Sequence, residues 1–445
     1  MSEEFIVNKK TVILSYITQF FQYASAIIVL PIILAYLDKS TLGVWYIFLS
    51  VSSLSYLLDF GFSSSLSRNI SFAFRGAKEI IKEGSPALSD NGEIDYNLLG
   101  SLLYTSKRTY AKISIILFIL LISLGTIYIE YATRDTYIPN KFIIWIFFSF
   151  STAFNYYYGY VNIFARGRGK IDLLNKTIII SKIVYIVTVF LLILFHWGLW
   201  ALVVGNFLSA LTARVVCLRG FYDKDFRFKL KSNSRKHKNL FPIIWHNAKR
   251  FGLASLTTFA FSQANIFIAG AFLSINDVAE LGLALQLMGV IVTCARVPFN
   301  TYYPRICALW VTKSVKAIRE IFIRCQLIGY LIWIAGFFVL IFWGNSILEF
   351  FHSKTYLPQT GVIMIYALFY LMELTHGNCS MLISSQNIVP FLNAAIAACA
   401  ISIFFMLLLI YLGFGLYSFP IAMCLANLPY NSWKWPVETY KLLKQ

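Results

Sequence analysis

Two short stretches place ionisable side chains inside otherwise apolar segments. One is LLDFGFSSSLSR (57–68), which carries Asp59 and Arg68. The other is LMELTHG (371–377), in which Glu373 and His376 are spaced i, i+3 and therefore share one face of a helix. A carboxylate beside an imidazole can exchange a proton or bind a cation, and an arginine can hold an anionic group. Ionisable groups at membrane depth cost about 3 kcal/mol each and are commonly functional, which makes both stretches candidate sites.

The composition indicates the kind of element that carries these side chains. Of the 445 residues, 58% are hydrophobic and 13% are charged, and the mean hydropathy is +0.69. Because a helix of about 20 apolar residues spans a bilayer, we predict an all-α, multi-pass membrane protein without a cleavable signal peptide. The twelve predicted spans are 12–37, 43–66, 108–130, 141–165, 177–196, 198–217, 251–273, 278–300, 325–348, 359–384, 389–412 and 415–433.

The basic residues predict the orientation of these spans. With a cytoplasmic N-terminus, every lysine and arginine lies in or beside an inner segment except Lys39, Arg134, Lys141 and Lys354. Both termini are then cytoplasmic. The formal charge of +18 follows from this topology and from contact with anionic lipid, so no nucleic-acid partner is expected. The seven cysteines show no CxxC spacing and the five histidines are scattered, so we expect neither a metal site nor a cofactor.

A parallel internal repeat relates two six-span halves. DKSTLG (38–43) aligns with DVAELG (277–282) at an offset of 239, and equivalent spans run in the same direction. The predicted organisation is an N-terminal half (1–217), a basic cytoplasmic linker (218–249), a C-terminal half (250–433) and a tail (434–445). Between spans 2 and 3, the stretch 75–85 is predicted to be an amphipathic helix, and Asp95 is predicted to cap the next one.

Polar stripes occupy equivalent faces of spans 1 and 7. The spacing is i, i+3, i+7, i+10 in both halves, which places each stripe on one helical face. Such a repeat is the architecture of alternating-access transporters, so we predict that the stripes line a central cavity between the halves. The alternative is that these side chains only join helices by hydrogen bonds. The residues are Ser15, Thr18, Gln22 and Ser25 in span 1, and Ser255, Thr258, Ser262 and Asn265 in span 7.

The segment LLDFGFSSSLSRNISFAFRGAKE (57–79) resembles the corresponding region of polysaccharide flippases, and more narrowly the O-antigen flippases of the Wzx type. These belong to the multidrug/oligosaccharidyl-lipid/polysaccharide exporter superfamily. The LGVW motif that opens span 2 and the ARGRGKIDLLN motif that ends span 4 extend the resemblance along the chain.

This resemblance implies a non-enzymatic transporter of the bacterial cytoplasmic (inner) membrane. The implied substrate is an undecaprenyl-pyrophosphate-linked oligosaccharide, moved from the inner to the outer leaflet and driven by an ion gradient, with a proton or sodium as candidate ion. Membrane lipids and other polysaccharide assembly proteins are the further implied partners. No P-loop is present, so direct use of ATP is not expected.

Two alternatives remain open. A cation-coupled multidrug exporter of the same superfamily commonly carries an acid in span 1, whereas residues 11–37 contain no Asp or Glu. A membrane-bound polysaccharide polymerase, which is an enzyme, would be expected to show a larger outer loop.

Given a flippase, four charged residues of spans 2 and 8 acquire expected roles. At an offset of 237, Asp59 is equivalent to Arg296 and Arg68 to Arg305. We predict that Asp59 and Arg296 form a cytoplasmic gate pair, and that Arg68 and Arg305 capture the pyrophosphate. The alternatives are that Asp59 bonds within its own half and that the arginines extend to lipid phosphate. Glu373 and His376 are the predicted ion-coupling site, the alternative being a pair that only packs their helix.

Overall fold

The structure is a computed structural model that describes residues 18, 28–59, 61–81, 93–232, 238–311, 314–385 and 390–444. Within its helices, the side chains of residues 64, 225, 231, 232, 247, 249–262, 304, 305, 307, 308, 310 and 311 are not described. The described residues form helices and connecting turns and contain no β-strand. Contacts divide the chain into unit 1, Met1–Leu37 with Phe48–Phe259, and unit 2, Asp38–Ile47 with Ala260–Gln445.

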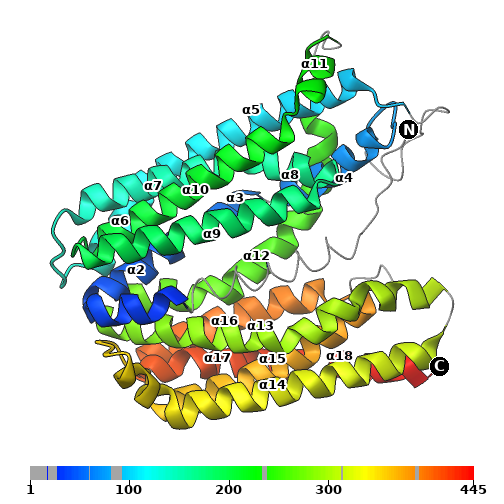
Figure 1. The fold of residues 1–445 in the computed structure, drawn as a ribbon. Helices are drawn as coiled ribbons and strands as arrows, with labels where there is room; N and C mark the ends of the chain where they lie inside the picture. The colour runs from blue at the N-terminus through cyan, green and yellow to red at the C-terminus, as the bar shows by residue number, and fades with distance from the viewer. Residues whose placement is uncertain are drawn as a thin grey trace. The chain divides into compact units, whose positions relative to one another are not determined.

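Unit 1 is a bundle in which α5, α7, α9 and α10 run alongside one another (Figure 1). A π-turn, η1, joins α5 to α6, so that the helix continues from Tyr96 to Ala132. The elements are α2 (Lys39–Ser52, which starts in unit 2), α3 (Ser55–Asp59), α4 (Phe62–Phe74), α5 (Tyr96–Leu120), η1 (Leu121–Gly125), α6 (Thr126–Ala132), α7 (Lys141–Tyr157), α8 (Gly159–Gly167), α9 (Ile171–Leu194), α10 (Leu199–Phe221), α11 (Lys224–Ser232) and the first part of α12 (Phe241–Phe272).

Unit 2 is built largely from long helices. Its central contacts are those of α13 with α14 and of α16 with α17. The elements are the end of α12, α13 (Ile275–Val311), α14 (Val315–Phe350), α15 (Thr360–Ser384), α16 (Leu392–Tyr411), η2 (Gly415–Tyr417), α17 (Ser418–Asn427) and α18 (Asn431–Lys444).

Eight described helical segments are long and apolar enough to cross a membrane. They carry predicted spans 2, 3, 5, 6, 8, 9, 10 and 11. The other four predicted spans fall on α7, α17 and segments that are only partly described, 12–37 and 251–273. Only 22% of the apolar window of α9, and the same share of α14, is buried within the protein, so the rest of these surfaces requires lipid. The chain is therefore an all-helical, multi-pass membrane protein, as predicted.

The connection between α4 and α5 confirms one sequence prediction and corrects another. Asp95 caps α5, because its carboxylate accepts the N–H groups of Asn97 and Leu98 at 2.8 and 3.2 Å. The predicted amphipathic helix is wrong for residues 75–81, which form turns and irregular backbone. Gly76 takes a left-handed φ of 88°, a conformation that a helix interior does not allow.

The first residues of α2 pack closely against the start of α13 within unit 2. Lys39 Nζ lies 2.6 Å from Glu280 Oε1, and the Tyr46 hydroxyl donates to Gln286 Oε1 at 2.8 Å. A Cβ at Gly282 would lie 2.3 Å from the ring of Tyr46, so only glycine allows this approach. These contacts join the two sequence motifs that are equivalent in the internal repeat.

Candidate functional site

The helical path breaks within the stretch 57–68, which carries Asp59 and Arg68. The helix α3 ends at Asp59, Gly61 adopts φ 69°, and α4 begins at Phe62. A left-handed backbone of this kind favours glycine, because a side chain there would be strained. The DFG sequence therefore turns the chain and leaves the Asp59 carboxylate at a break between two helices.

The Asp59 carboxylate is held by partners within unit 1. The Tyr110 hydroxyl donates to Asp59 Oδ1 at 3.0 Å. The other oxygen, Oδ2, accepts hydrogen bonds from the backbone N–H and the hydroxyl of Ser63, at 3.2 and 2.7 Å. Both carboxylate oxygens are thus engaged, which fixes their orientation.

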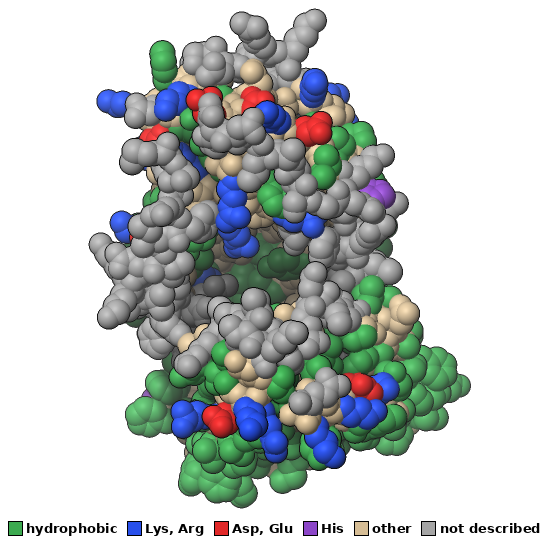
Figure 2. All heavy atoms as spheres, turned by 90° about the vertical axis from the view of Figure 1, so that its right-hand side faces the viewer, with side chains coloured by type: hydrophobic (Ala, Val, Ile, Leu, Met, Phe, Trp, Pro, Cys, Tyr) green, Lys and Arg blue, Asp and Glu red, His purple; other side chains and the backbone are tan. Residues whose placement is uncertain are grey.

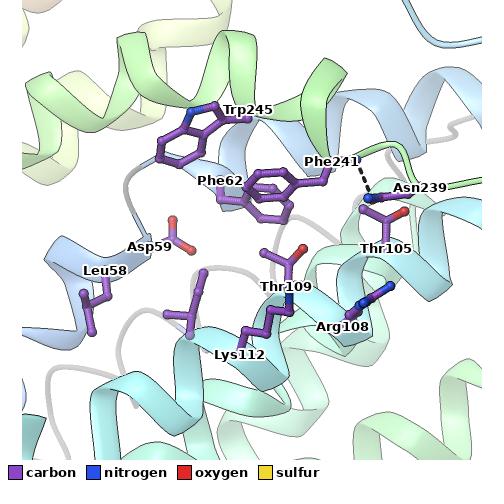
Figure 3. Close-up of a pocket in the computed structure, with 11 residues that line it drawn as sticks. Leu58, Asp59, Phe62, Thr105, Arg108, Thr109, Lys112, Asn239, Phe241 and Trp245 are labelled. Atoms are coloured by element: carbon purple, nitrogen blue, oxygen red, sulfur yellow. Dashed lines mark hydrogen bonds between the residues drawn. The ribbon is translucent and has the colours of Figure 1, made fainter. Parts of the chain in front are cut away.

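A pocket of about 340 Å³ opens beside this carboxylate, and we call it the Asp59 pocket. In Figure 3, aromatic rings of α4 and α12 lie on one side and polar side chains of α5 on the other. The lining residues are Leu58, Asp59, Phe62, Thr105, Arg108, Thr109, Lys112, Ile113, Asn239, Phe241 and Trp245.

The aromatic side of the Asp59 pocket is a stack of three rings. Phe62 and Phe241 have ring centroids 6.0 Å apart at 27°, and Phe241 and Trp245 have centroids 5.7 Å apart at 15°. Trp245 is 39% exposed, so part of its ring is accessible from the pocket. Flat, accessible aromatic surfaces of this kind can stack against a sugar ring or an acyl chain.

The polar side of the Asp59 pocket carries two cations. Arg108 and Lys112 stand four residues apart on the α5 face that also presents Thr105 and Thr109. The Arg108 guanidinium donates to the Tyr104 hydroxyl at 3.3 Å. Across the described part of the chain, neither cation forms an ion pair with an acidic residue. Two cations against the single carboxylate of Asp59 give the lining a net positive charge.

The segment before α12 is tied to α5, and this positions the aromatic rings. The N–H of Leu240 donates to the Thr105 hydroxyl at 3.0 Å, and that of Lys238 donates to Ser101 Oγ at 3.2 Å. Asn239 Oδ1 accepts the N–H of Phe241 at 3.1 Å and so caps the helix start. Part of the predicted linker thus forms one side of the Asp59 pocket.

A second charged cluster lies in unit 2. Arg296 of α13 forms an ion pair with Glu373 of α15, and its guanidinium also reaches the Glu373 carbonyl oxygen at 3.4 Å. Gly377 leaves room for this guanidinium, because a Cβ there would lie 2.9 Å from Arg296 Nη2. His376 follows one turn after Glu373, and its Nε2 is buried without a hydrogen-bond partner among the described residues.

The structure assigns partners to the predicted gate residues. Asp59 bonds within unit 1 and Arg296 pairs within unit 2, which is the alternative that the sequence left open for Asp59. The helix α13 continues through Pro298, whereas the equivalent Gly61 interrupts its helix. A pairing of Asp59 with Arg296 stays a prediction about another state of the protein.

The remaining predicted site residues are only partly described. Arg68 is exposed on α4. Thr18 and Asn265 of the polar stripes are buried, at 3% and 2% exposure. Ser15, Gln22 and Ser25 lie outside the described residues, and the side chains of Ser255, Thr258, Ser262 and Arg305 are not described.

Several pocket residues were missed by the sequence analysis. The positive-inside bias accounted for Arg108 and Lys112 as topology signals, although their i, i+4 spacing beside Thr105 and Thr109 marks one polar face. Phe241 and Trp245 share the same spacing at the end of the linker. Lysine and arginine side chains are prominent on the face of the protein that Figure 2 shows.

Comparisons with known proteins place the chain in a family. The model of the family described as "Polysaccharide biosynthesis protein" matches residues 8–310. No curated protein sequence matches the chain.

Solved transporter structures share the fold. An inward-facing multidrug resistance MATE family transporter of the MOP superfamily is 12% identical with a TM-score of 0.68, covering 96% of this chain and 94% of that one. The MATE multidrug transporter DinF-BH, solved as a complex, is 16% identical, with a TM-score of 0.60 and coverage of 100% and 97%. A MOP superfamily transporter from Pyrococcus furiosus, described by a reverse polarity of its binding pocket, is 13% identical, with a TM-score of 0.54 and coverage of 98% and 94%.

The family match extends from residue 8 through the rest of the N-terminal half and into α13, and it includes every lining residue of the Asp59 pocket. The structural likeness extends over nearly the whole chain at low identity, so it establishes the fold. Together they confirm the resemblance noted in the sequence at the level of family and superfamily. The chain belongs to the polysaccharide biosynthesis protein family and has the fold of MOP-superfamily transporters.

Proposed function

We propose that this protein flips an undecaprenyl-pyrophosphate-linked oligosaccharide, such as an O-antigen repeat unit, from the inner to the outer leaflet of a bacterial cytoplasmic membrane by alternating access. The observation that carries the proposal is the Asp59 pocket, with its two cations and accessible aromatic surface. A diphosphate-sugar headgroup is anionic and cannot cross hydrocarbon unaided. Cations bind its phosphates, aromatic rings stack on its sugars, and hydroxyls such as those of Thr105 and Thr109 exchange hydrogen bonds with it.

A multidrug exporter is the second candidate, and several similar solved structures are multidrug transporters. An organic cation would be attracted by an accessible carboxylate and repelled by Arg108 and Lys112. In the Asp59 pocket the two cations outnumber the one carboxylate, which already accepts hydrogen bonds from Tyr110 and Ser63, so the balance favours an anion. The match to a polysaccharide biosynthesis family favours the same choice.

We assign the coupling of transport to an ion gradient to the cluster of Arg296, Glu373 and His376 in unit 2. A proton or sodium ion that competes for Glu373 would weaken its attraction for Arg296 and free the guanidinium to attract the substrate's phosphates. His376 supplies a titratable neighbour one turn away. A Glu373→Gln, His376→Ala double variant is expected to lose transport or its pH dependence. Unchanged transport and unchanged pH dependence at normal expression would contradict this role.

The function is tested by complementation of bacterial strains that lack their own O-antigen flippase. Expression of this chain is expected to restore surface polysaccharide in strains whose repeat unit it accepts. An Arg108→Gln, Lys112→Gln double variant is expected to lose this activity, whereas Lys176→Gln, an exposed lysine of α9 outside the Asp59 pocket, is expected to retain it. Export of cationic dyes without any restored polysaccharide would instead favour the multidrug exporter.

A further inference from the structure

A second pocket lies between α4 and α8, and we call it the two-arginine pocket. Its volume is about 330 Å³, and it is lined by Ser63, Ser67, Arg68, Ser71, Ile163 and Arg166. The three serines stand at i, i+4 and i+8 on α4, so they share one face of that helix. The SSSLSRNIS stretch and the ARGRGK motif, which lie far apart in the sequence, therefore meet at one site.

Close helix packing brings the two arginines to the same pocket. A Cβ at Gly167 would lie 2.4 Å from Ile70 Cγ2, so glycine at this position lets α8 approach α4 directly beside Arg166. Arg68 and Arg166 are both exposed, and no ion pair or hydrogen bond joins either guanidinium to a partner in the part of the chain that is described. Two like charges held at one pocket repel each other, and this repulsion is relieved when an anion binds between them.

The hydroxyl groups complete the donor set. Ser71 Oγ donates to the Ser67 carbonyl oxygen at 3.0 Å, and Ser63 Oγ donates to Asp59. The Ser67 hydroxyl has no such bond among the described residues and is free to donate to a ligand. Two planar guanidinium groups and a hydroxyl form a donor set suited to a phosphate group.

We propose that Arg68, Arg166 and Ser67 bind a phosphate group carried by a lipid. Two sources share this chemistry: the diphosphate of the transported carrier lipid, and the headgroup of a resident anionic phospholipid. The first source rests on the proposed function, and the second does not. Ser63 links the two pockets, because it lines this one while bonding to Asp59 of the other. A diphosphate held here is therefore next to the Asp59 pocket.

The test measures lipid binding to purified protein in detergent by native mass spectrometry. The probes are a polyprenyl diphosphate, the neutral polyprenol with the same chain, and phosphatidylglycerol. The variants are Arg68→Gln, Arg166→Gln and Arg166→Lys. The matched control is Arg219→Gln, which changes an exposed arginine in the last turn of α10, outside both pockets.

Each glutamine variant is expected to bind the preferred phosphate lipid about tenfold more weakly, because one charge-assisted contact is lost. Arg166→Lys is expected to retain part of the affinity, and polyprenol binding is expected not to change. Without lipid, the glutamine variants should be at least as thermostable as the wild type, because a like-charge repulsion is removed. A preference for polyprenyl diphosphate identifies the carrier as the source, and a preference for phosphatidylglycerol identifies the resident lipid.

Equal affinity of the glutamine variants, the control and the wild type for both phosphate lipids would overturn the proposal. So would a lower thermal stability of Arg166→Gln without lipid, since that result assigns the arginine to packing. The measurement requires no transport, so a failure of the flippase function would leave it readable.

Discussion

Removing the carboxylate of Glu373 should destabilise the protein through Arg296. In the Glu373→Gln variant the guanidinium keeps its place between α13 and α15 but loses its counter-charge. Each side chain of the pair is 30% exposed. Pairs at a protein surface contribute up to about 1 kcal/mol, and removing one partner of a fully buried pair costs about 3–5 kcal/mol. For an environment between these limits we expect about 2 kcal/mol, which is roughly a thirtyfold change in the folded-to-unfolded ratio.

The assay is heat treatment of the purified protein in detergent, followed by size-exclusion chromatography of what remains folded. A cost of about 2 kcal/mol corresponds to a decrease of about 4–8 °C in the midpoint for a unit of about 200 residues. Glu320→Gln, which removes an exposed carboxylate of α14 in the same unit, is the control and should shift the midpoint little. The Arg296→Gln, Glu373→Gln double variant should recover most of the loss, because it leaves no unpaired charge.

Two results would refute this reasoning. One is a Glu373→Gln midpoint no lower than that of Glu320→Gln. The other is a double variant that loses the sum of the two single losses, since independent sites add in this way. In transport assays, rescue by exchanging the charges of Arg296 and Glu373 would support their pairing as the working contact. Rescue by Asp59→Arg with Arg296→Asp would instead support the gate pair predicted from the repeat.

Three further changes have defined outcomes. Gly282→Leu should separate the start of α13 from the Tyr46 ring, at a cost of about 1–3 kcal/mol in folding free energy. A cysteine pair that replaces Lys39 and Glu280 should then crosslink less in this variant, and unchanged crosslinking would contradict the packing. Burial alone would raise the pKa of Asp223, but hydrogen bonds from Lys170 and the backbone, together with the charge of Arg168, outweigh burial and lower this pKa. The ionised carboxylate therefore stabilises the fold above its unfolded pKa, and this stabilisation is lost as the pH falls through the folded pKa. Asp223→Asn should therefore reduce thermal stability at pH 7 and have a smaller effect near pH 3. An equal loss at both pH values would argue against the ion pairs. Asp95→Ala should cost about 1 kcal/mol through loss of the α5 cap, whereas Asp95→Asn, which can still cap, should cost less in the same heating assay.

The sequence could predict features that depend on local chemistry. Apolar length predicted the membrane helices, and the carboxylate of Asp95 predicted a cap. Each of these signals lies within a few residues of its effect. The predicted helix after α4 failed because its apolar spacing was offset by Gly76, whose left-handed backbone ends the helical path.

Contacts between distant residues could not be predicted in the same way. The partner of Arg296 lies 77 residues away on α15, and the internal repeat pointed to Asp59 instead. The meeting of Arg68 with Arg166 depends on the close approach allowed by Gly167, which a single sequence does not reveal. Helix periodicity defines a polar face but leaves open which helix that face will meet.

The central claim is that the Asp59 pocket holds the anionic headgroup of a lipid-linked oligosaccharide during flipping. The most direct measurement reconstitutes the protein in sealed vesicles with a radiolabelled undecaprenyl-pyrophosphate-linked oligosaccharide and follows its movement between leaflets. The wild type and an Arg219→Gln, Lys176→Gln control should flip the lipid, and Arg108→Gln with Lys112→Gln should flip it at least about tenfold more slowly. Flipping at the wild-type rate by the pocket variant, or no flipping by the wild type with any such lipid, would contradict the account.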